Sequence, residues 1–102
     1  MTKTENLFVT LMEECAEVQQ TVSKVTRFGV DGYNPVAPQK TNGADVLTEY
    51  YQLIAVMEMI IDRGILPQLD KDDIDRIKAD KKLKVMHYQD VSCGIGCVKD
   101  ME

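Results

Sequence analysis

The sequence has no surplus of basic residues and no long apolar run. Its 102 residues include 12 Lys and Arg against 17 Asp and Glu, so the formal net charge is −5. Binding a nucleic-acid backbone requires a basic face, so this charge argues against nucleic acid as the main partner. No apolar stretch approaches the roughly 20 residues of a membrane-spanning helix. We therefore expect neither a nucleic acid nor a membrane as a partner.

Signals for export and for disulfide-based folding are also missing. The N-terminus, Met-Thr-Lys-Thr-Glu, contains no apolar core of a signal peptide. The cysteines number three, an odd count in a chain that looks intracellular, so a disulfide framework is not expected. We expect a cytoplasmic protein. The 44% of hydrophobic and 28% of charged residues are ordinary for one globular domain.

Segments with helical periodicity make up most of the chain. The predicted helices cover about residues 7–26, 43–63 and 71–89. Thr2 and Glu5 have the spacing of a capping box before the first helix, and Asn42 and Asp70 can cap the other two. Pro and Gly residues interrupt the chain between and after these segments. The predicted fold class is therefore all-α.

The three predicted helices can bury only a small hydrophobic core. The second is apolar over more than half of its circumference, so it should lie at the centre of a bundle. A small helical domain of this kind gains stability by pairing with a copy of itself. We expect a helical domain over residues 1–92 that completes its bundle as a homodimer or tetramer. Residues 93–102 should form an irregular tail.

Carboxylates occur on or beside the apolar faces of two predicted helices. At 100° per residue, Glu14 lies on the edge of the first apolar stripe, Glu17 somewhat outside it and Glu13 further round. Glu49 projects from the apolar face of the second helix, and Gln52 follows it by one turn. An unpaired buried carboxylate costs several kcal/mol, so it is usually neutralised, ion-paired or metal-bound. If the two helices pack antiparallel, these side chains converge.

Such oxygen ligands on facing helices suit Mg²⁺ or Mn²⁺, which retain water molecules for a phosphate substrate. The alternative is structural. The acids could form ion pairs with Lys24, Arg27 and lysines of the third helix, or face water.

These residues resemble a known family. Glu13-Glu14-x-x-Glu17, followed on the next helix by Glu49-x-x-Gln52, is similar to the EExxE…ExxD pattern of the MazG-like all-α nucleoside triphosphate pyrophosphohydrolases. Further similarity lies in Lys24-x-x-Arg27-Phe28-Gly29, Thr41-Asn42 and Lys84-Val85-x-x-Tyr88. The resemblance extends over residues 5–92.

The resemblance implies metal-dependent hydrolysis of a (d)NTP to the (d)NMP and pyrophosphate, with Mg²⁺ or Mn²⁺ as cofactor. The metal ligands that it implies are Glu14, Glu17, Glu49 and Gln52. It places Glu13 and Glu14 in catalytic positions. The nucleotide would be held by Lys24, Arg27, Phe28, Lys81 and Lys84.

One position departs from the family pattern, because Gln52 stands where the family has Asp. An amide oxygen can ligate a hard cation but brings no charge, so metal affinity should fall. Asp45, on the same side of the helix, could compensate. A second hypothesis is therefore a catalytically weak protein that binds or sequesters a nucleotide. A third is a helical adaptor whose acids face solvent.

The loop over residues 29–41 is long for a small domain, and such loops are usually functional or mobile. Phe28 and Tyr33 could stack on a base there, although core packing is the commoner fate of a residue such as Phe28.

The sulfur-containing residues suggest little chemistry. His87, Cys93 and Cys97 are residue types that bind zinc, but a fourth ligand is missing, so free thiols are the simpler interpretation. Cys15 should belong to the core, because it lies in the middle of the first apolar stripe.

Overall fold

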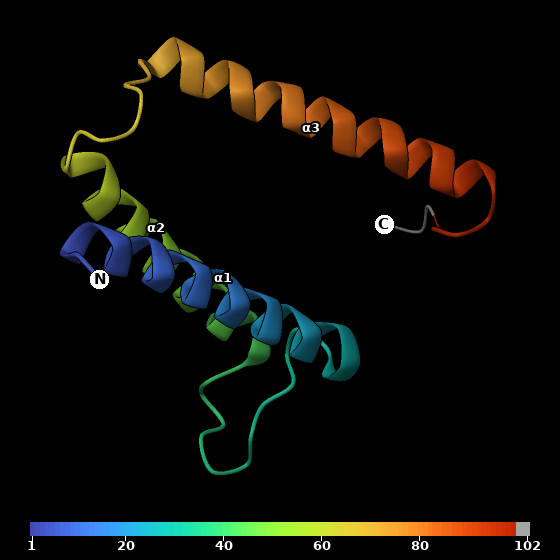
Figure 1. Ribbon diagram of the computed structural model, residues 1–102. Coiled ribbons are helices and arrows are strands. Elements are labelled where there is room, and N and C mark those ends of the chain that lie inside the picture. The colour runs from blue at the N-terminus through green and yellow to red at the C-terminus, as the bar shows by residue number, and fades with distance from the viewer. Residues whose placement is uncertain (100–102) are drawn as a thin grey trace. The chain divides into compact units, whose positions relative to one another are not determined.

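The computed structural model describes residues 1–99, which form three α-helices joined by loops (Figure 1). The helices are α1 (Lys3–Phe28), α2 (Asn42–Asp62) and α3 (Lys71–Gly94). No strand occurs in these residues, although one isolated β-bridge joins Tyr33 to Thr41. The predicted all-α fold is therefore confirmed. None of the described helices is both long enough and apolar enough to span a bilayer.

The chain divides into two compact units, Met1–Leu66 with α1 and α2, and Pro67–Glu102 with α3. In the second unit α3 continues beyond the predicted end near residue 89 and reaches Gly94. Residues 93 and 94 of the segment 93–102, which was expected to be irregular, are therefore helical. Turns follow over residues 95–98, and residues 100–102 of that segment lie outside the described part.

Capping boxes begin α1 and α3, which confirms the box predicted at Thr2 and the cap predicted at Asp70. The Glu5 backbone N–H donates to Thr2 Oγ1 at 3.1 Å, and the Thr2 N–H donates back to the Glu5 carboxylate at 2.8 Å. Asp70 and Asp73 make the corresponding pair of bonds in α3. These bonds satisfy N–H groups that the first turn of a helix leaves without a partner.

The predicted cap of α2 is wrong by one residue. Thr41 is the N-cap, and its hydroxyl accepts a hydrogen bond from the Ala44 N–H at 3.1 Å. Asn42 is the first helical residue, and its amide instead donates to the Gly29 carbonyl at 3.1 Å. Asn42 therefore connects the two ends of the loop.

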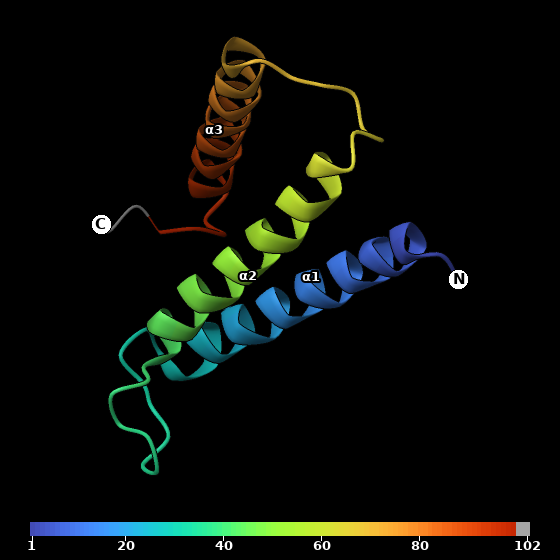
Figure 2. The same ribbon diagram turned by 90° about the vertical axis from the view of Figure 1, so that its left-hand side faces the viewer.

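Helices α1 and α2 pack side by side and antiparallel (Figure 2). The side chains between them recur at alternating steps of four and three residues, the spacing of a coiled-coil seam. The seam consists of Leu7, Leu11, Glu14, Val18, Thr21 and Val25 on α1, and of Val46, Glu49, Leu53, Val56 and Ile60 on α2. All of these side chains are buried or half-buried.

The expectation that Cys15 belongs to the core is wrong. Cys15 is exposed, and so is Val22, because the seam is centred one residue earlier, on Glu14 and Thr21. A step of one residue rotates a side chain by 100°. The apolar stripe in the sequence is wide enough to cover both the seam and a second, neighbouring stripe, and its centre falls between them.

The second stripe makes an exposed apolar face on the hairpin of α1 and α2. Its members each follow a seam position by one residue: Phe8, Met12, Cys15 and Val22 on α1, and Leu47, Tyr50, Ile54, Met57 and Ile61 on α2. Because the helices are antiparallel, this step turns both stripes toward the same side. Most of these side chains are exposed; Met12 keeps 72% and Leu47 60% of its accessible surface.

The loop between α1 and α2 is held by backbone hydrogen bonds at its base. The Asn42 N–H donates to the Gly32 carbonyl at 2.8 Å, and the Gly43 N–H donates to the Val30 carbonyl at 2.9 Å. A Cβ atom on Gly32 would lie 2.7 Å from the Phe28 carbonyl oxygen, so this close approach requires glycine. Two successive turns at the tip are closed by the Ala37 and Lys40 N–H groups. The loop therefore has a defined shape.

Candidate carboxylate site and loop cavity

Three carboxylates converge at the middle of the hairpin. Glu14 and Glu17 come from α1, and Glu49 comes from α2 across the seam. One oxygen of each lies within 4.8 Å of the others. The convergence that was expected from antiparallel packing is therefore present. We call these three residues the carboxylate cluster.

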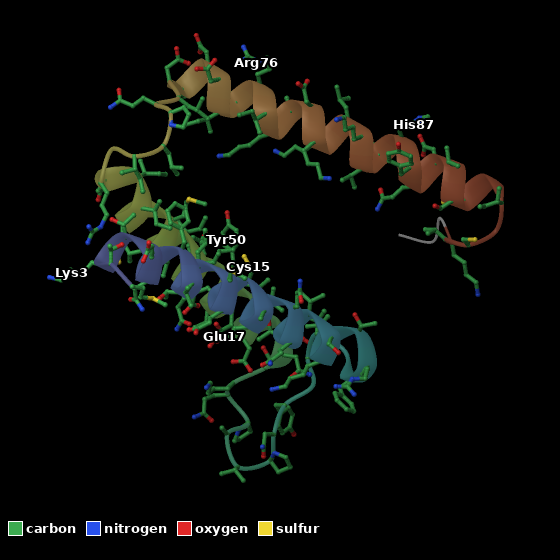
Figure 3. All side chains as sticks on the ribbon, viewed as in Figure 1. Lys3, Cys15, Glu17, Tyr50, Arg76 and His87 are labelled. Carbon is green, nitrogen blue, oxygen red and sulfur yellow. The ribbon has the colours of Figure 1, made fainter. Side chains whose placement is uncertain are left out.

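The carboxylate cluster opens on the side of the hairpin opposite the exposed apolar face. A step of three residues from a seam position turns a side chain away from that face, which places Glu17 and Gln52 on the same open side. Figure 3 shows this division, with Glu17 on one side of the hairpin and Cys15 and Tyr50 on the other. Solvent or a ligand can thus reach the cluster while the apolar face is covered.

Two members of the cluster hold a buried oxygen without a hydrogen bond. Glu14 and Glu49 are half-buried in the seam, and Oε2 of each is buried and accepts no hydrogen bond from residues 1–99. Glu17 is exposed. Among the described residues the one ion pair joins Arg76 to Asp73 on α3 at 2.9 Å. The alternative of structural ion pairs with lysine or arginine is therefore not realised there.

The environment favours the protonated forms of two cluster carboxyls. Burial is the main reason why the pKa of Glu14 is raised, and the neighbouring charges of Glu17 and Glu13 raise it further. A carboxyl–carboxylate hydrogen bond with Glu17 is the largest cause of the raised pKa of Glu49, followed by burial. The charge of Asp45 also contributes to the pKa of Glu49. Burial, hydrogen bonding and the neighbouring negative charges thus all favour protonation of Glu14 and Glu49.

The remaining predicted site residues of the hairpin lie around the cluster. Glu13 is exposed and outside the group of converging oxygens, although its charge acts on Glu14. Gln52 is exposed one turn after Glu49. Asp45 does not join the converging carboxylates and instead lines a cavity at the loop. The charge of Asp45 nevertheless acts on Glu49, and its compensation for Gln52 stays a prediction.

The cavity, which we call the loop cavity, has a volume of about 820 Å³, within the usual range of small-molecule sites. It lies between the end of α1, the loop and the start of α2. Its charged and aromatic lining side chains are Lys24, Phe28, Tyr33, Lys40 and Asp45. Lys24 and Phe28 were expected to bind substrate, and both are part of this lining. Phe28 is exposed rather than packed in a core.

Other predicted substrate residues lie elsewhere. The Arg27 guanidinium is not part of the loop cavity, and its carbon lies 5.4 Å from the centre of the Phe28 ring, a cation–π distance. Lys81 and Lys84 belong to α3 in the second unit, where they line a separate groove of about 310 Å³. Their contact with phosphate stays a prediction.

The zinc interpretation of the C-terminal residues gains no support. Among residues 1–99 the carboxylate cluster is the one group of three or more His, Cys, Asp or Glu side chains close enough to share an ion. Cys93 and Cys97 are free thiols, and the ring of His87 packs edge-on against Tyr88.

Two lining residues of the loop cavity, Lys40 and Asp45, were not assigned to substrate binding from the sequence. The length of the loop was the available signal, but its folded path decides which side chains face inward. Comparisons of the chain with protein-family models, with curated proteins and with solved structures found no match. The case for a function therefore rests on the site itself.

The raised pKa values predict a pH dependence of stability. The folded state binds more protons than the unfolded state between the raised pKa values of Glu14 and Glu49 and their ordinary value of 4.5. The metal-free protein should therefore become more stable as the pH falls from 7 through this range, with no further gain from these groups below it.

Thermal unfolding followed by circular dichroism from pH 4 to 8 measures this effect. Glu49→Gln should raise the melting temperature at pH 7 and flatten its pH dependence, because the amide carries no charge. Glu58→Gln on the exposed side of α2 is the matched control. Equal pH dependence in Glu49→Gln and in the wild type would contradict the assignment.

Proposed function

We propose that this protein is a Mg²⁺- or Mn²⁺-dependent nucleoside triphosphate pyrophosphohydrolase of the MazG-like kind. The observation that carries the proposal is the convergence of Glu14, Glu17 and Glu49 from two facing helices. The carboxylates stand at positions that match the family pattern, and no lysine or arginine of residues 1–99 neutralises them. A loop cavity of nucleotide size follows directly along the hairpin.

The donor set fits a hard divalent cation. Carboxylate oxygens are the ligands that Mg²⁺ and Mn²⁺ prefer, and the buried Oε2 atoms of Glu14 and Glu49 have no other partner among residues 1–99. A cation would offset the repulsion that raises their pKa values. Glu14, Glu17 and Glu49 would hold the metal, with the Gln52 amide oxygen as a neutral fourth ligand. When bound, the metal polarises phosphoryl oxygens and lowers the pKa of a water ligand.

The surrounding side chains would bind and orient the substrate. Lys24 and Lys40 form no ion pair within residues 1–99, so their charges are available for an anionic ligand. The rings of Phe28 and Tyr33 offer apolar surfaces to a base. Glu13, exposed next to the cluster, would orient the water that attacks the α-phosphorus, and pyrophosphate would leave.

We also propose that the chain assembles as a homodimer or tetramer. Within residues 1–99 only Ile60 and Thr21 are buried, which is little for a stable domain. The exposed apolar face of the hairpin provides the surface that a second hairpin would cover to complete a four-helix bundle. The carboxylate cluster lies on the opposite side and would stay open.

A catalytically weak nucleotide-binding protein is the second candidate, and Gln52 favours it. The position lacks the negative charge of the family Asp, and Asp45 lines the loop cavity instead of joining the converging carboxylates. Binding would then persist while the metal is held too weakly for efficient hydrolysis.

The first test is release of pyrophosphate from a panel of NTPs and dNTPs with Mg²⁺ or Mn²⁺, with EDTA as the control. We expect metal-dependent turnover by the wild type and its loss in Glu49→Ala, because one of three charged ligands is gone. Glu49→Ala should keep its helical circular dichroism. If metal and nucleotide together produce neither turnover nor thermal stabilisation, the helical adaptor is the remaining interpretation.

Gln52→Asp separates the enzyme from the weak binder. If the metal is held weakly, a fourth charge should tighten metal binding by roughly tenfold or more, since charge-assisted ligand contacts are worth about 1.5–3 kcal/mol. Isothermal titration with Mn²⁺ measures the affinity, and the pyrophosphate assay measures the activity. A large gain in activity identifies the present chain as metal-impaired, whereas an unchanged rate shows that Gln52 does not limit it.

The oligomer can be tested by analytical ultracentrifugation at micromolar concentration. The wild type should sediment as a dimer or tetramer, and Leu47→Glu should weaken the assembly because it places a charge on the apolar face. Thr48→Glu adds the same charge on an exposed position of the same helix turned away from that face and should have little effect. A wild-type monomer at this concentration would refute the assembly.

A further inference from the structure

The loop cavity presents a specific set of free hydrogen-bonding groups. Each of its two asparagine amides uses one atom in the loop itself, since Asn34 Oδ1 accepts from the Val36 N–H and Asn42 Nδ2 donates to the Gly29 carbonyl. Asn34 Nδ2 and Asn42 Oδ1 remain as neutral polar groups of the lining. The carboxylate of Asp45 makes no hydrogen bond and no ion pair with residues 1–99. Lys24 and Lys40 likewise have no carboxylate partner there. The free charged groups of the lining are thus one carboxylate and two cationic donors, and two aromatic rings lie in the same lining.

A carboxylate with two free oxygens matches two adjacent donors. Guanine is the base that presents such a pair on its Watson–Crick edge, N1–H next to the N2 amino group, with O6 as an acceptor beside them. Adenine and cytosine present one donor beside an acceptor, and uracil and thymine present one donor between two acceptors. The Asp45 carboxylate, the one anionic acceptor of the lining, therefore complements guanine better than the other bases.

The loop cavity and the carboxylate cluster are close enough for one nucleotide. Asp45 precedes Glu49 by one turn of α2, about 6 Å along the helix axis. Lys24 follows Glu17 by two turns of α1, about 10 Å. A base in the cavity would therefore leave its phosphates directed along the hairpin toward the cluster.

We propose that the loop cavity selects guanine nucleotides, with Asp45 accepting hydrogen bonds from N1–H and the N2 amino group. Lys40 donates to O6, and Tyr33 and Phe28 border the base. This inference rests on the proposed nucleotide function, and it names the base that the site reads. Asp45 thus acts as a specificity residue rather than as a metal ligand.

The test compares the binding of nucleoside diphosphates, which cannot be cleaved to a monophosphate and pyrophosphate. Titration calorimetry with Mg²⁺ present would measure GDP, IDP, XDP, ADP, CDP and UDP against the full chain. IDP lacks only the N2 amino group, so its affinity should be about tenfold lower than that of GDP, since this hydrogen bond has a charged acceptor. The comparison of GDP with IDP requires no variant.

The Asp45→Asn variant should change which base the site prefers, and should not only weaken nucleotide binding. Its amide offers one acceptor and one donor, which mismatch the two donors of guanine but match N1–H and the O2 carbonyl of xanthine. XDP should then bind at least as tightly as GDP. Asp31→Asn is the matched control. Asp31 belongs to the loop that borders the cavity, but it is exposed and does not line the cavity. Its preference for GDP should be unchanged.

Equal affinity for GDP and IDP, or a guanine preference that survives in Asp45→Asn, would overturn the inference. The proposed function would still stand if pyrophosphate is released from other nucleotides. If no diphosphate binds, the inference is also overturned, and the pyrophosphate assay decides separately whether the proposed function is retained.

Discussion

The stability of the hairpin of α1 and α2 depends on how its packing seam accommodates several negative charges. Glu14 and Glu49 occupy seam positions whose neighbours are mostly apolar, and Glu17 lies beside them. Burying an unpaired carboxylate there costs desolvation free energy, and no lysine or arginine within residues 1–99 offsets this cost. Leucine at either position would give a more stable helix pair. The proposed cation would offset this cost, which no neighbouring side chain of the described residues does.

The parts of the fold that follow from local rules could be predicted from the sequence. Helical periodicity located the three helices, and the predicted caps Thr2 and Asp70 marked two of their starts. The three carboxylates could also be brought together, because a side chain on an apolar face must lie against whatever helix packs there. Local periodicity and antiparallel packing were sufficient for this part of the site.

Features that depend on tertiary register could not be predicted. An average wheel placed Cys15 in the core, whereas the seam selects Glu14, because a second apolar stripe widens the pattern by one residue. Asn42 looked like a cap, but its amide reaches the Gly29 carbonyl across the loop. The inward orientation of Lys40 and Asp45 depends on the same loop path, which no periodicity describes.

Because hydrogen bonds hold the loop at its base, substitutions at the base and substitutions at the tip have different consequences. The base is tied to the first residues of α2 by main-chain groups and by the Asn42 amide, and the close approach at position 32 requires glycine. The tip, where Val36 keeps 90% of its surface exposed, contributes almost nothing to the packing of the hairpin. Substitutions at the tip can therefore reshape one wall of the cavity while leaving the carboxylates in place. Under the proposed function, this arrangement would let ligand preference diverge during evolution without a loss of folding stability.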